Sequence, residues 1–484
     1  MAYKHYKDNR EFIKALIESG DLVTIEQEVD WDMELGAIVR RACEKKSPAP
    51  YFKKIKDYPG WEGFGAPLST WRRLNIAMGL DPDTPINVLQ DEYLRRITEP
   101  LVKPVEIARN DAPCKENILT GADVDLFKLV APMVHGGDGG RYLCTWHMVV
   151  GASLKDPEFV NWGMYRQMVF DETTMCGPVL PFSDMGKMFY GEYAPLNKPM
   201  PFATVIGMDP LSGVAACAPS PYPETEYTGQ LMGAPVELVK CETSDLLVPA
   251  HAEIIIEGEV IPHVGIEEAP FGEYTGYRTS PRAGRTVYKV KCITYRNNPI
   301  LTVSNMGVPT DEGQLLRSFS LALEMRKLIE SQQIPISGVY MLPESTHHLV
   351  VVGVKNAYPG IAHQIGHLVF GSKLAPWFHQ VMVVDEKTDI YNINELIHDF
   401  CTKLHPSRGI HIYTSHVGTP LYPFASPEDR KYGKGDKVVF DCLFPLDWPL
   451  AETPIKVIFS NKDIYPEEVQ QKVLGSWKSY GFKD

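Results

Sequence analysis

The segment Glu268-Ala-Pro-Phe-Gly-Glu273 places two carboxylates five residues apart around a turn, and Asn161-Trp-Gly-Met-Tyr-Arg166 supplies an amide and a guanidinium upstream. A guanidinium between two carboxylates holds one of them ionised and leaves the other able to carry a proton. Acid–base chemistry at neutral pH requires this arrangement. Arg166, Glu268 and Glu273 are therefore candidate catalytic residues. For the acidic turn alone, a solvated surface turn is an equally good interpretation.

A second set of polar residues is suited to a divalent metal. Glu224 lies after a proline-rich loop, and Asn161 and Asp184 precede it in the chain. Carboxylate and amide oxygens are hard ligands that suit Mn²⁺ or Mg²⁺. Spacing alone supports this site weakly, because acidic residues in loops are usually solvated.

Three further motifs favour structural roles. His363 and His367 would share one helix face, but Gln364 stands where a zinc protease needs a glutamate, so an ordinary packed helix is predicted. The glycines of 136–140 lack the lysine and hydroxyl of a phosphate-binding loop, which favours a flexible turn. His147 lies in an apolar strand and is predicted to be a core histidine.

Composition limits the classes of partner. The chain has 484 residues, a net charge of −13 and no basic stripe, which argues against binding nucleic acid or an anionic membrane surface. No apolar run is long enough to span a bilayer, and the N-terminus lacks the apolar core of a signal peptide. The nine cysteines form no CxxC pair, so reduced thiols in a cytoplasmic protein are expected.

The elements that must position these residues begin with an α/β region. Asp8 and Glu11 predict a capping box at the start of a helix that Gly20 ends, followed by a strand at Leu22–Val29 and a helix near Met33–Lys45. The buried stripe of the first helix is predicted to contain Phe12, Ile13, Leu16 and Ile17.

The middle of the chain is rich in Val, Ile, Thr and aromatic residues between Gly, Pro and Asp turns, which predicts antiparallel β structure, such as a barrel. The expected strands are Leu143–Ala152, Phe202–Met208, Val236–Glu242, Glu253–Ile261, Thr286–Tyr295 and Ile300–Ser304.

From about Asp311 the pattern alternates between helix and strand. Leucines at 315, 316, 323 and 328 with Phe319 predict a helix, and His348–Val354 and Gln380–Asp385 read as buried strands. This alternation is typical of a mixed or parallel α/β domain, and Pro466 with two glutamates predicts a final exposed helix.

Taken together, these residues resemble the UbiD-type decarboxylase family, which uses prenylated FMN. The resemblance covers nearly the whole chain. It rests on six segments in family order, namely those around Asp8–Ile25, Ala112–Asn117, Asp138–Tyr142, Asn161–Arg166, Cys241–Glu253 and Glu268–Glu273.

The resemblance implies roles for the candidate residues. Glu273 would exchange a proton with the substrate carbon, while Arg166 would orient the substrate carboxylate and pair with Glu268. Asn161, Trp162, Arg166 and Glu224 would lie at the cofactor. The modified flavin would form a covalent adduct with the substrate and accept its electrons, which no amino-acid side chain can do.

The resemblance also implies metals. Asn161 and Glu224 match ligands of a divalent ion, usually Mn²⁺, that bridges to the cofactor phosphate, and a K⁺ site of backbone oxygens would lie near Trp162 and 216–219. The family commonly has histidine as the third ligand of the divalent ion, and this chain has Asp184 at that position. An aspartate adds negative charge beside a phosphate, which would favour tighter metal binding or a changed coordination.

The implied architecture is an α+β or α/β multidomain protein. An N-terminal α/β domain (1–115) and a C-terminal α/β oligomerisation domain (313–484) would flank a central, flavin-reductase-like split β-barrel (116–312). A homodimer or homohexamer and a flavin prenyltransferase that supplies the cofactor are expected partners.

The implied reaction is reversible non-oxidative decarboxylation of an aromatic, heteroaromatic or α,β-unsaturated acid, with a CoA thioester as a further option. Two alternatives are a flavin-binding oxidoreductase, which no nicotinamide fingerprint supports, and a non-catalytic cofactor-holding protein. A flat apolar pocket is one interpretation of the residues Phe182, Met185, Met188, Phe189, Tyr190 and Trp377, and ordinary core packing is the other.

Overall fold

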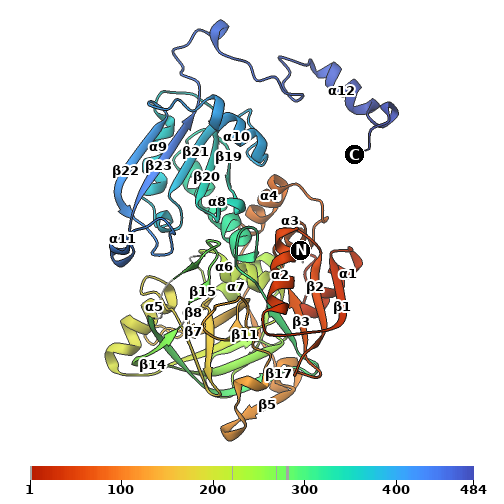
Figure 1. Ribbon diagram of the computed structural model, residues 1–484, viewed down its shortest axis with the longest axis vertical. Helices are drawn as coiled ribbons and strands as arrows, with labels where there is room; N and C mark the ends of the chain where they lie inside the picture. The colour runs from red at the N-terminus through yellow and green to blue at the C-terminus, as the bar shows by residue number, and fades with distance from the viewer. Residues whose placement is uncertain (1–2, 221, 269, 280–282, 484) are drawn as a thin grey trace.

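The computed structural model describes residues 3–220, 222–268, 270–279 and 283–483. They form three parts, each built on a β-sheet (Figure 1). The N-terminal part (red) lies beside the central part (yellow and green), and the C-terminal part (blue) lies at the other end of the long axis. This mixed α/β multidomain organisation agrees with the sequence prediction.

The N-terminal sheet has the strand order β1-β2-β3-β18. Its strands are β1 (Leu22–Val29), β2 (Ala49–Ile55), β3 (Glu62–Gly65) and β18 (Ile300–Val303), and its helices are α1 (Asn9–Glu18), α2 (Glu34–Glu44), α3 (Trp71–Ala77) and α4 (Ile86–Arg96). The strand at 300–303 was expected in the middle region. That expectation is wrong, because β18 pairs in parallel with β3 and so returns the chain to the first sheet.

Helix α1 departs from its predicted details in two places. Asp8 caps it by accepting from Glu11 N at 2.8 Å, but the Glu11 carboxylate accepts from Lys7 N, so the expected capping box is not formed. Ile17 is 55% exposed, because it lies at the edge of the buried stripe that Phe12 and Leu16 centre. Gly20, with φ of +70°, follows the helix end as predicted.

The central part holds a nine-stranded antiparallel sheet, which confirms the antiparallel prediction. Its strands run in the order β6-β9-β10-β17-β14-β11-β7-β8, and β5 also pairs with β17. Their bounds are β5 Asn117–Thr120, β6 Tyr142–Cys144, β7 His147–Ala152, β8 Val160–Gly163, β9 Gln167–Asp171, β10 Thr174–Gly177, β11 Met200–Ile206, β14 Ile254–Glu268 and β17 Ala283–Tyr295. The pairing is an open path, and the split barrel stays a prediction.

Smaller elements complete the central part. A three-stranded sheet joins β4 (Val105–Glu106), β12 (Glu237–Lys240) and β13 (Leu247–Pro249), and β15 (Phe271–Gly272) pairs with β16 (Arg278–Thr279). Its helices are α5 (Asp184–Met188), α6 (Pro210–Cys217) and α7 (Glu224–Met232).

The C-terminal part is the predicted mixed α/β unit. Its sheet order is β19-β20-β21-β23-β22, with the parallel neighbours β20, β21 and β23 flanked by antiparallel edges. The strands are β19 Ile336–Met341, β20 Leu349–Val354, β21 Gln380–Asp385, β22 Ile410–Val417 and β23 Lys434–Cys442, and the helices are α8 Glu312–Ser331, α9 Ile361–Phe370, α10 Ile393–Thr402, α11 Pro427–Tyr432 and α12 Glu467–Ser476.

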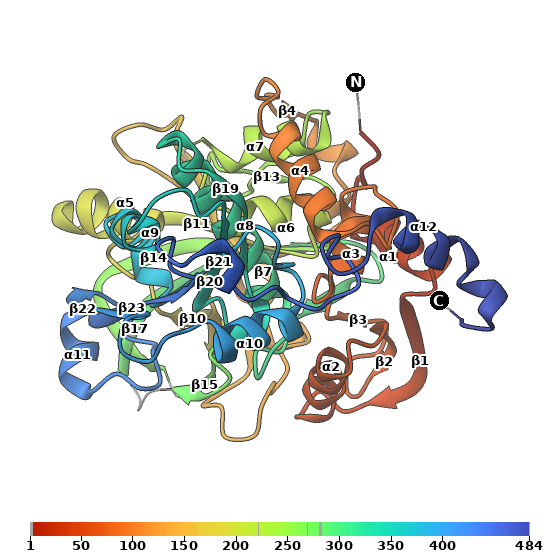
Figure 2. The same cartoon turned by 90° about the horizontal axis from the view of Figure 1, so that it is seen from above.

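Helix α8 joins the three parts. Asp311 and Gln314 form a capping box at its start, and its apolar side chains are buried over most of its length. It packs against α4, α6 and β19, one element from each part, and lies near the centre of the molecule in Figure 2. Side chains on this helix can therefore contact both the central and the C-terminal parts.

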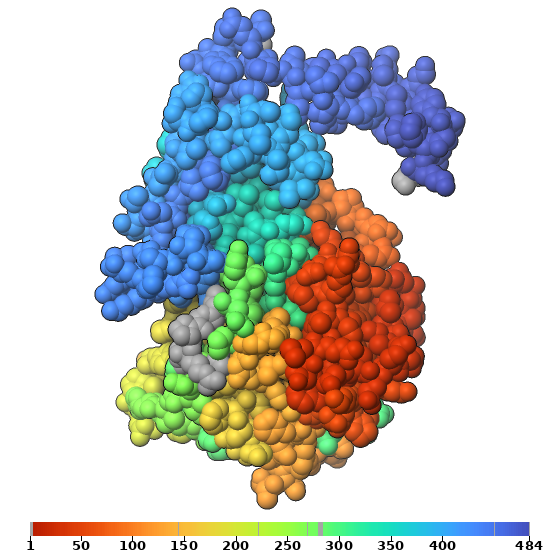
Figure 3. Space-filling view, in the orientation of Figure 1, coloured from red at the N-terminus to blue at the C-terminus, as the bar shows by residue number. Residues whose placement is uncertain are grey.

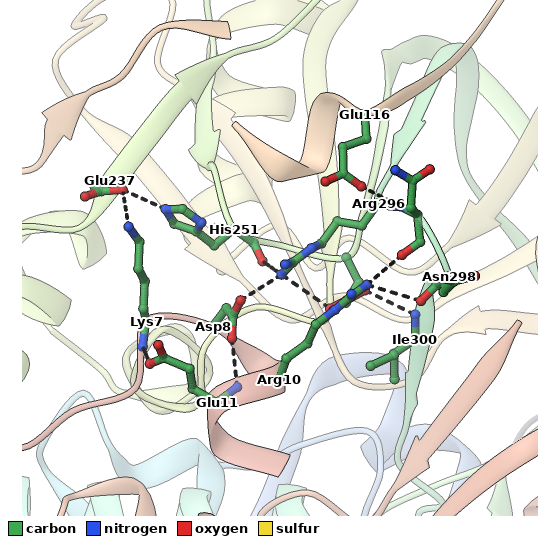
Figure 4. A network of polar contacts seen from close by, with 12 residues as sticks. Lys7, Asp8, Arg10, Glu11, Glu116, Glu237, His251, Arg296, Asn298 and Ile300 are labelled. Atoms are coloured by element: carbon green, nitrogen blue, oxygen red, sulfur yellow. Dashed lines mark hydrogen bonds and ion pairs between the residues drawn. The ribbon is translucent and has the colours of Figure 1, made fainter. Parts of the chain in front are cut away.

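A partly buried ionic network connects the N-terminal helix to the central part (Figure 4). Arg10 binds Glu253 through two bonds of 2.8 Å, and Arg296 bonds Asp8 at 2.8 Å. Glu253 is fully buried, so its charge depends on these guanidinium partners. The network ties residues about 240 positions apart and sets the arrangement of the first two parts.

The chain after Thr453 extends away from the body (Figure 3). Helix α12 has no buried residue, as predicted for this segment, and Val469, Leu474 and Trp477 are exposed. In the part of the chain that the structure describes, no helix is both long enough and apolar enough to cross a bilayer.

Candidate active site

The three candidate acid–base residues meet in space. Arg166 lies between β8 and β9, Glu268 ends β14, and Glu273 follows β15. Arg166 Nε and Nη2 donate to Glu268 Oε1 and Oε2 at 2.7 and 2.9 Å, and Arg166 Nη1 pairs with Glu273 Oε1. Both carboxylates are buried, with 2% and 5% of Glu268 and Glu273 exposed. One guanidinium thus binds two acids encoded about a hundred residues later.

The two acids differ in their surroundings. Besides Arg166, Glu268 accepts from Arg285 Nε at 3.1 Å and from Tyr142 Oη at 3.1 Å. Three donors satisfy the oxygens of this acceptor-only carboxylate. Glu273 makes a single ion pair, with Arg166, among the described residues. Glu273 is therefore the acid that can exchange a proton with a bound molecule.

Aromatic residues enclose this cluster. The Phe271 ring lies 5.3 Å from the Arg166 guanidinium carbon and 4.3 Å from the Tyr142 ring. Burial, followed by the charge of Glu268, raises the pKa of Tyr142, so its hydroxyl remains a donor at neutral pH. Apolar walls of this kind exclude water and strengthen the ion pairs inside them.

Asp138 is a structural residue of the site that the sequence interpretation missed. It is 7% exposed, and its carboxylate accepts from His135 Nδ1 at 2.9 Å and from Gly272 N at 3.1 Å. The turn predicted for 136–140 is present, and Asp138 ties it to the backbone between Phe271 and Glu273. A lone aspartate among four glycines was the available signal.

His135 completes that support. Its Nε2 lies 2.7 Å from Asn305 Oδ1 and 2.9 Å from Met306 O. Burial acts to lower its pKa, but the bonds to Asp138 and Asn305 outweigh burial and raise that pKa. The turn that carries Phe271 and Glu273 is thus held in place by a hydrogen-bonded chain of Asp138, His135 and Asn305.

Two of the three candidate metal ligands lie together. Asn161, on β8, is 4% exposed, and Trp162 N donates to Glu224 Oε2 at 2.9 Å. Glu224 is partly exposed as a residue, but its carboxyl lies in desolvated surroundings that raise its pKa to about 7. Asn161 Nδ2 and Trp162 Nε1 are buried without a hydrogen-bond partner.

Asp184 differs from these two residues. Its side chain is 52% exposed and pairs with Lys187 Nζ at 2.8 Å. Its charge still reaches Glu224 and contributes to the raised pKa there. Among the described residues, no three His, Cys, Asp or Glu side chains are grouped for metal binding.

The corner formed by Asn161 and Glu224 nonetheless fits a hard divalent ion. Such ions bind through one or two carboxylates plus the phosphate oxygens of a bound molecule. A cation here would neutralise the desolvated Glu224 carboxyl. The donor set therefore suits a metal that a phosphate-bearing cofactor helps to hold.

The remaining candidate residues have structural roles. His147 is buried and its Nε2 lies 2.7 Å from Tyr165 O, and burial lowers its pKa to about 4. His363 and His367 lie on α9, where His363 packs 3.7 Å from the His411 ring. The structure thus agrees with the core interpretation of His147 and with a packed helix at 363–367.

The predicted apolar pocket residues divide into two groups. Met185, Met188 and Phe189 belong to the central core, which favours the packing interpretation for them. Phe182 is 53% exposed and its ring lies 6.4 Å from Trp377, and Tyr190 is 42% exposed. Phe182 and Trp377 therefore remain candidates for contact with a ligand.

Models of three successive domains of 3-octaprenyl-4-hydroxybenzoate carboxy-lyase match the chain. The N-terminal model matches residues 13–93, the Rift-related model residues 105–309 and the C-terminal model residues 314–442. Ferulic acid decarboxylase 1 of Saccharomyces cerevisiae is 32% identical, with 98% of each chain covered. The chain belongs to the UbiD family of carboxy-lyases.

Further relatives of this UbiD-family protein support the same family assignment. A pyrrole-2-carboxylic acid decarboxylase of Pseudomonas aeruginosa is 29% identical, with 99% of each chain covered. The closed form of vanillic acid decarboxylase from Sedimentibacter hydroxybenzoicus superposes with a TM-score of 0.87 at 29% identity, covering 98% of this chain and 100% of that one. The UbiD-class enzyme HmfF of Pelotomaculum thermopropionicum in complex with FMN gives a TM-score of 0.83 at 25% identity, covering 93% and 97%.

Proposed function

We propose that this protein catalyses the reversible non-oxidative decarboxylation of an aromatic, heteroaromatic or α,β-unsaturated carboxylic acid, free or as a CoA thioester. One observation carries the proposal: two buried acids share Arg166, yet Glu268 has three donors and Glu273 has one partner. This asymmetry supports a fixed anion beside a proton carrier. The names of the decarboxylase relatives support the reaction class.

The chain's own residues have three tasks in this reaction. Arg166 orients the substrate carboxylate and pairs with Glu268. Glu273 delivers a proton to the carbon that has lost CO₂, and in the reverse direction removes it. Phe271 and Tyr142 exclude water from the reacting atoms.

The proposed cofactor is prenylated FMN, which when bound supplies the electron sink that side chains lack. Asn161, Trp162, Arg166 and Glu224 would hold it. Asn161 and Glu224, with Asp184, would bind Mn²⁺ or another divalent ion, and K⁺ would bind to nearby backbone oxygens. The raised pKa of Glu224 supports a cation at this corner.

The proposal also includes the oligomeric state of the protein and the source of its cofactor. A flavin prenyltransferase would provide the cofactor in the cytoplasm, and the central sheet would close as a split barrel around it. A homodimer or homohexamer is supported by exposed apolar residues on one face of α10, namely Ile393, Ile397 and Phe400. Light scattering of the purified protein measures the assembly.

The test uses protein co-expressed with a flavin prenyltransferase. The holoprotein is incubated with a panel of aromatic and α,β-unsaturated acids in ¹³C-bicarbonate, and label exchange into the carboxyl group is followed by mass spectrometry. Exchange into at least one acid is expected. Loaded protein that exchanges no acid, or that instead oxidises NAD(P)H, contradicts the proposal.

A further inference from the structure

A second arginine, Arg285, binds one carboxylate of the Arg166 cluster from the neighbouring strand. Arg285 lies on β17 and is paired with Ile266 of β14, two residues before Glu268. Residues two apart along a strand lie on the same face of the sheet, so the Arg285 side chain can reach Glu268 across the pair of strands. Its Nε donates to Glu268 Oε2 at 3.1 Å. Arg285 therefore supplies a second cation to an acid that Arg166 already binds.

The donors to Glu268 are divided evenly between its two oxygens. Oε1 accepts from Arg166 Nε at 2.7 Å and from Tyr142 Oη at 3.1 Å. Oε2 accepts from Arg166 Nη2 at 2.9 Å and from Arg285 Nε at 3.1 Å. Each oxygen thus has one donor from Arg166 and one from another residue. The Glu268 side chain is only 1% exposed, so an oxygen left without a donor would be costly.

All three nitrogens of Arg166 already bind carboxylates of the protein. Nε and Nη2 donate to Glu268, and Nη1 pairs with Glu273. In the proposed reaction Arg166 also orients the substrate carboxylate, so one of these nitrogens has to turn toward the substrate. Nη2 can turn at the lowest cost, because Arg285 donates to the same oxygen of Glu268. Nη1 is less suited, since it is the cation partner of Glu273.

We propose that Arg285 is a positioning residue, which holds Glu268 Oε2 while Arg166 Nη2 turns to the carboxylate of the substrate. The charges support this role. Two guanidiniums balance the two carboxylates of the cluster, whereas Arg166 alone would leave a net negative charge that repels an anionic substrate. Arg285 acts through Glu268 and not by touching the substrate. The inference rests on the proposed function, since that function brings a carboxylate to Arg166.

The test compares acids with their uncharged amides and measures binding apart from turnover. Holoprotein is titrated calorimetrically with 3-phenylpropanoate and cyclohexanecarboxylate, saturated acids that cannot react, and with the amide of each. Arg285→Gln is expected to weaken binding of at least one acid about tenfold, the size of one charge-assisted hydrogen bond, and that of its amide less than about twofold. Unchanged acid affinity, equal losses for acid and amide, or a parent protein that binds neither acid overturns the inference.

Two further variants separate the charge of Arg285 from its packing. Arg285→Lys keeps the charge and is expected to bind the acid within about threefold of the parent. Lys291→Gln is the matched control, because Lys291 lies on the same strand and pairs at the surface with Glu259. It removes the same charge away from Glu268 and should change neither affinity. An acid affinity that falls equally in Lys291→Gln and Arg285→Gln would overturn the assignment to Arg285.

Turnover distinguishes failure of this inference from failure of the proposed function. For an acid that exchanges label, Arg285→Gln should raise KM about tenfold and leave kcat within about threefold, because Glu273 keeps its partner. If acid binding depends on Arg285 but no acid exchanges label, the decarboxylase proposal fails and the role in binding stands. If an acid is turned over with the same KM in the parent and in Arg285→Gln, only the inference fails. Circular dichroism melts of each variant check that the fold is intact.

Discussion

The Arg166 cluster and the corner at Asn161 and Glu224 both place acidic side chains in desolvated surroundings. The two regions differ in the partners that the protein supplies to those acids. Within the Arg166 cluster, each carboxylate has a guanidinium partner supplied by the protein itself. At the corner, Glu224 accepts from the backbone amide of Trp162 and pairs with no cation among the described residues, and its pKa is raised to about 7. The first region is preorganised by the protein, whereas the second is suited to a charge that arrives with a ligand.

This difference separates two physical tasks. A proton carrier must be in place before the substrate binds, since reorganisation during the reaction would slow it. A metal site can instead leave its carboxylate without a cationic partner in the protein. The attraction between that carboxylate and an incoming cation then contributes to the free energy of metal binding. The predictions below test whether the two regions behave in these ways.

Glu273→Gln should give the largest effect. Removing the proposed proton carrier is expected to lower the rate of decarboxylation about 10³-fold, a typical loss for general acid catalysis, without removing bound cofactor. The measurement is CO₂ release together with the visible spectrum of the protein. Glu267→Gln, at an exposed residue of β14 next to Glu268, is the control and should retain full activity. Comparable rates in the two variants would contradict the assigned role.

Arg166→Met tests whether the Arg166 guanidinium stabilises the buried carboxylate of Glu273. The substitution leaves Glu273 buried without its cation, which should lower the free energy of unfolding by about 4 kcal/mol. Glu268 keeps Arg285 and Tyr142, so adding Glu273→Gln in a double variant should restore more than half of the loss. Urea unfolding followed by circular dichroism measures both. An equal loss in the single and double variants would show that packing, and not charge, explains the effect.

The raised pKa of Glu224 predicts that the free energy of unfolding of the metal-free protein depends on pH. Its pKa in the folded protein is raised above the ordinary value of 4.5 to about 7. The stability contributed by its neutral form is therefore fully present below pH 4.5 and is lost as the pH rises through 7. After allowance for partial exposure, the loss is about 2 kcal/mol.

Mn²⁺ should reverse that loss. Added Mn²⁺ is expected to raise the melting temperature clearly at pH 8 and little at pH 5, because only the ionised carboxylate binds the ion. Glu224→Gln should abolish this difference between the two pH values. A Mn²⁺ effect that is equal at both pH values would contradict a role for Glu224.

Lys187→Ala should give the smallest effect. The ion pair with Asp184 is exposed, so the free energy of unfolding should change by less than about 0.5 kcal/mol. Releasing Asp184 should nevertheless strengthen Mn²⁺ binding about twofold, if this aspartate is a ligand. Calorimetry of Mn²⁺ binding, with Asp184→Asn in parallel, decides the point: no change in either variant excludes Asp184.

Many helices and strands were predictable because local sequence patterns specify them. The strand at Leu22–Val29 and the strand at Gln380–Asp385 were predicted with their observed bounds. Helix α8 was predicted from its leucines, and the exposed final helix from its acidic start. Errors arose where long-range pairing decides: Ile300–Val303 joins the first sheet, and no local pattern reveals a partner about 240 residues earlier.

The sequence by itself determined which chemical groups are available: two acids around a tight turn, and a guanidinium that follows an amide. The family resemblance assigned roles to these groups. Only the tertiary structure decided that Arg166 binds both acids, that Glu268 has three donors while Glu273 has one, and that Asp138 supports the turn. It also placed Arg285 on the same oxygen of Glu268 that Arg166 Nη2 binds. The physical reason is that ion pairing and desolvation depend on distance and burial, which the packing of β8, β14, β15 and β17 creates.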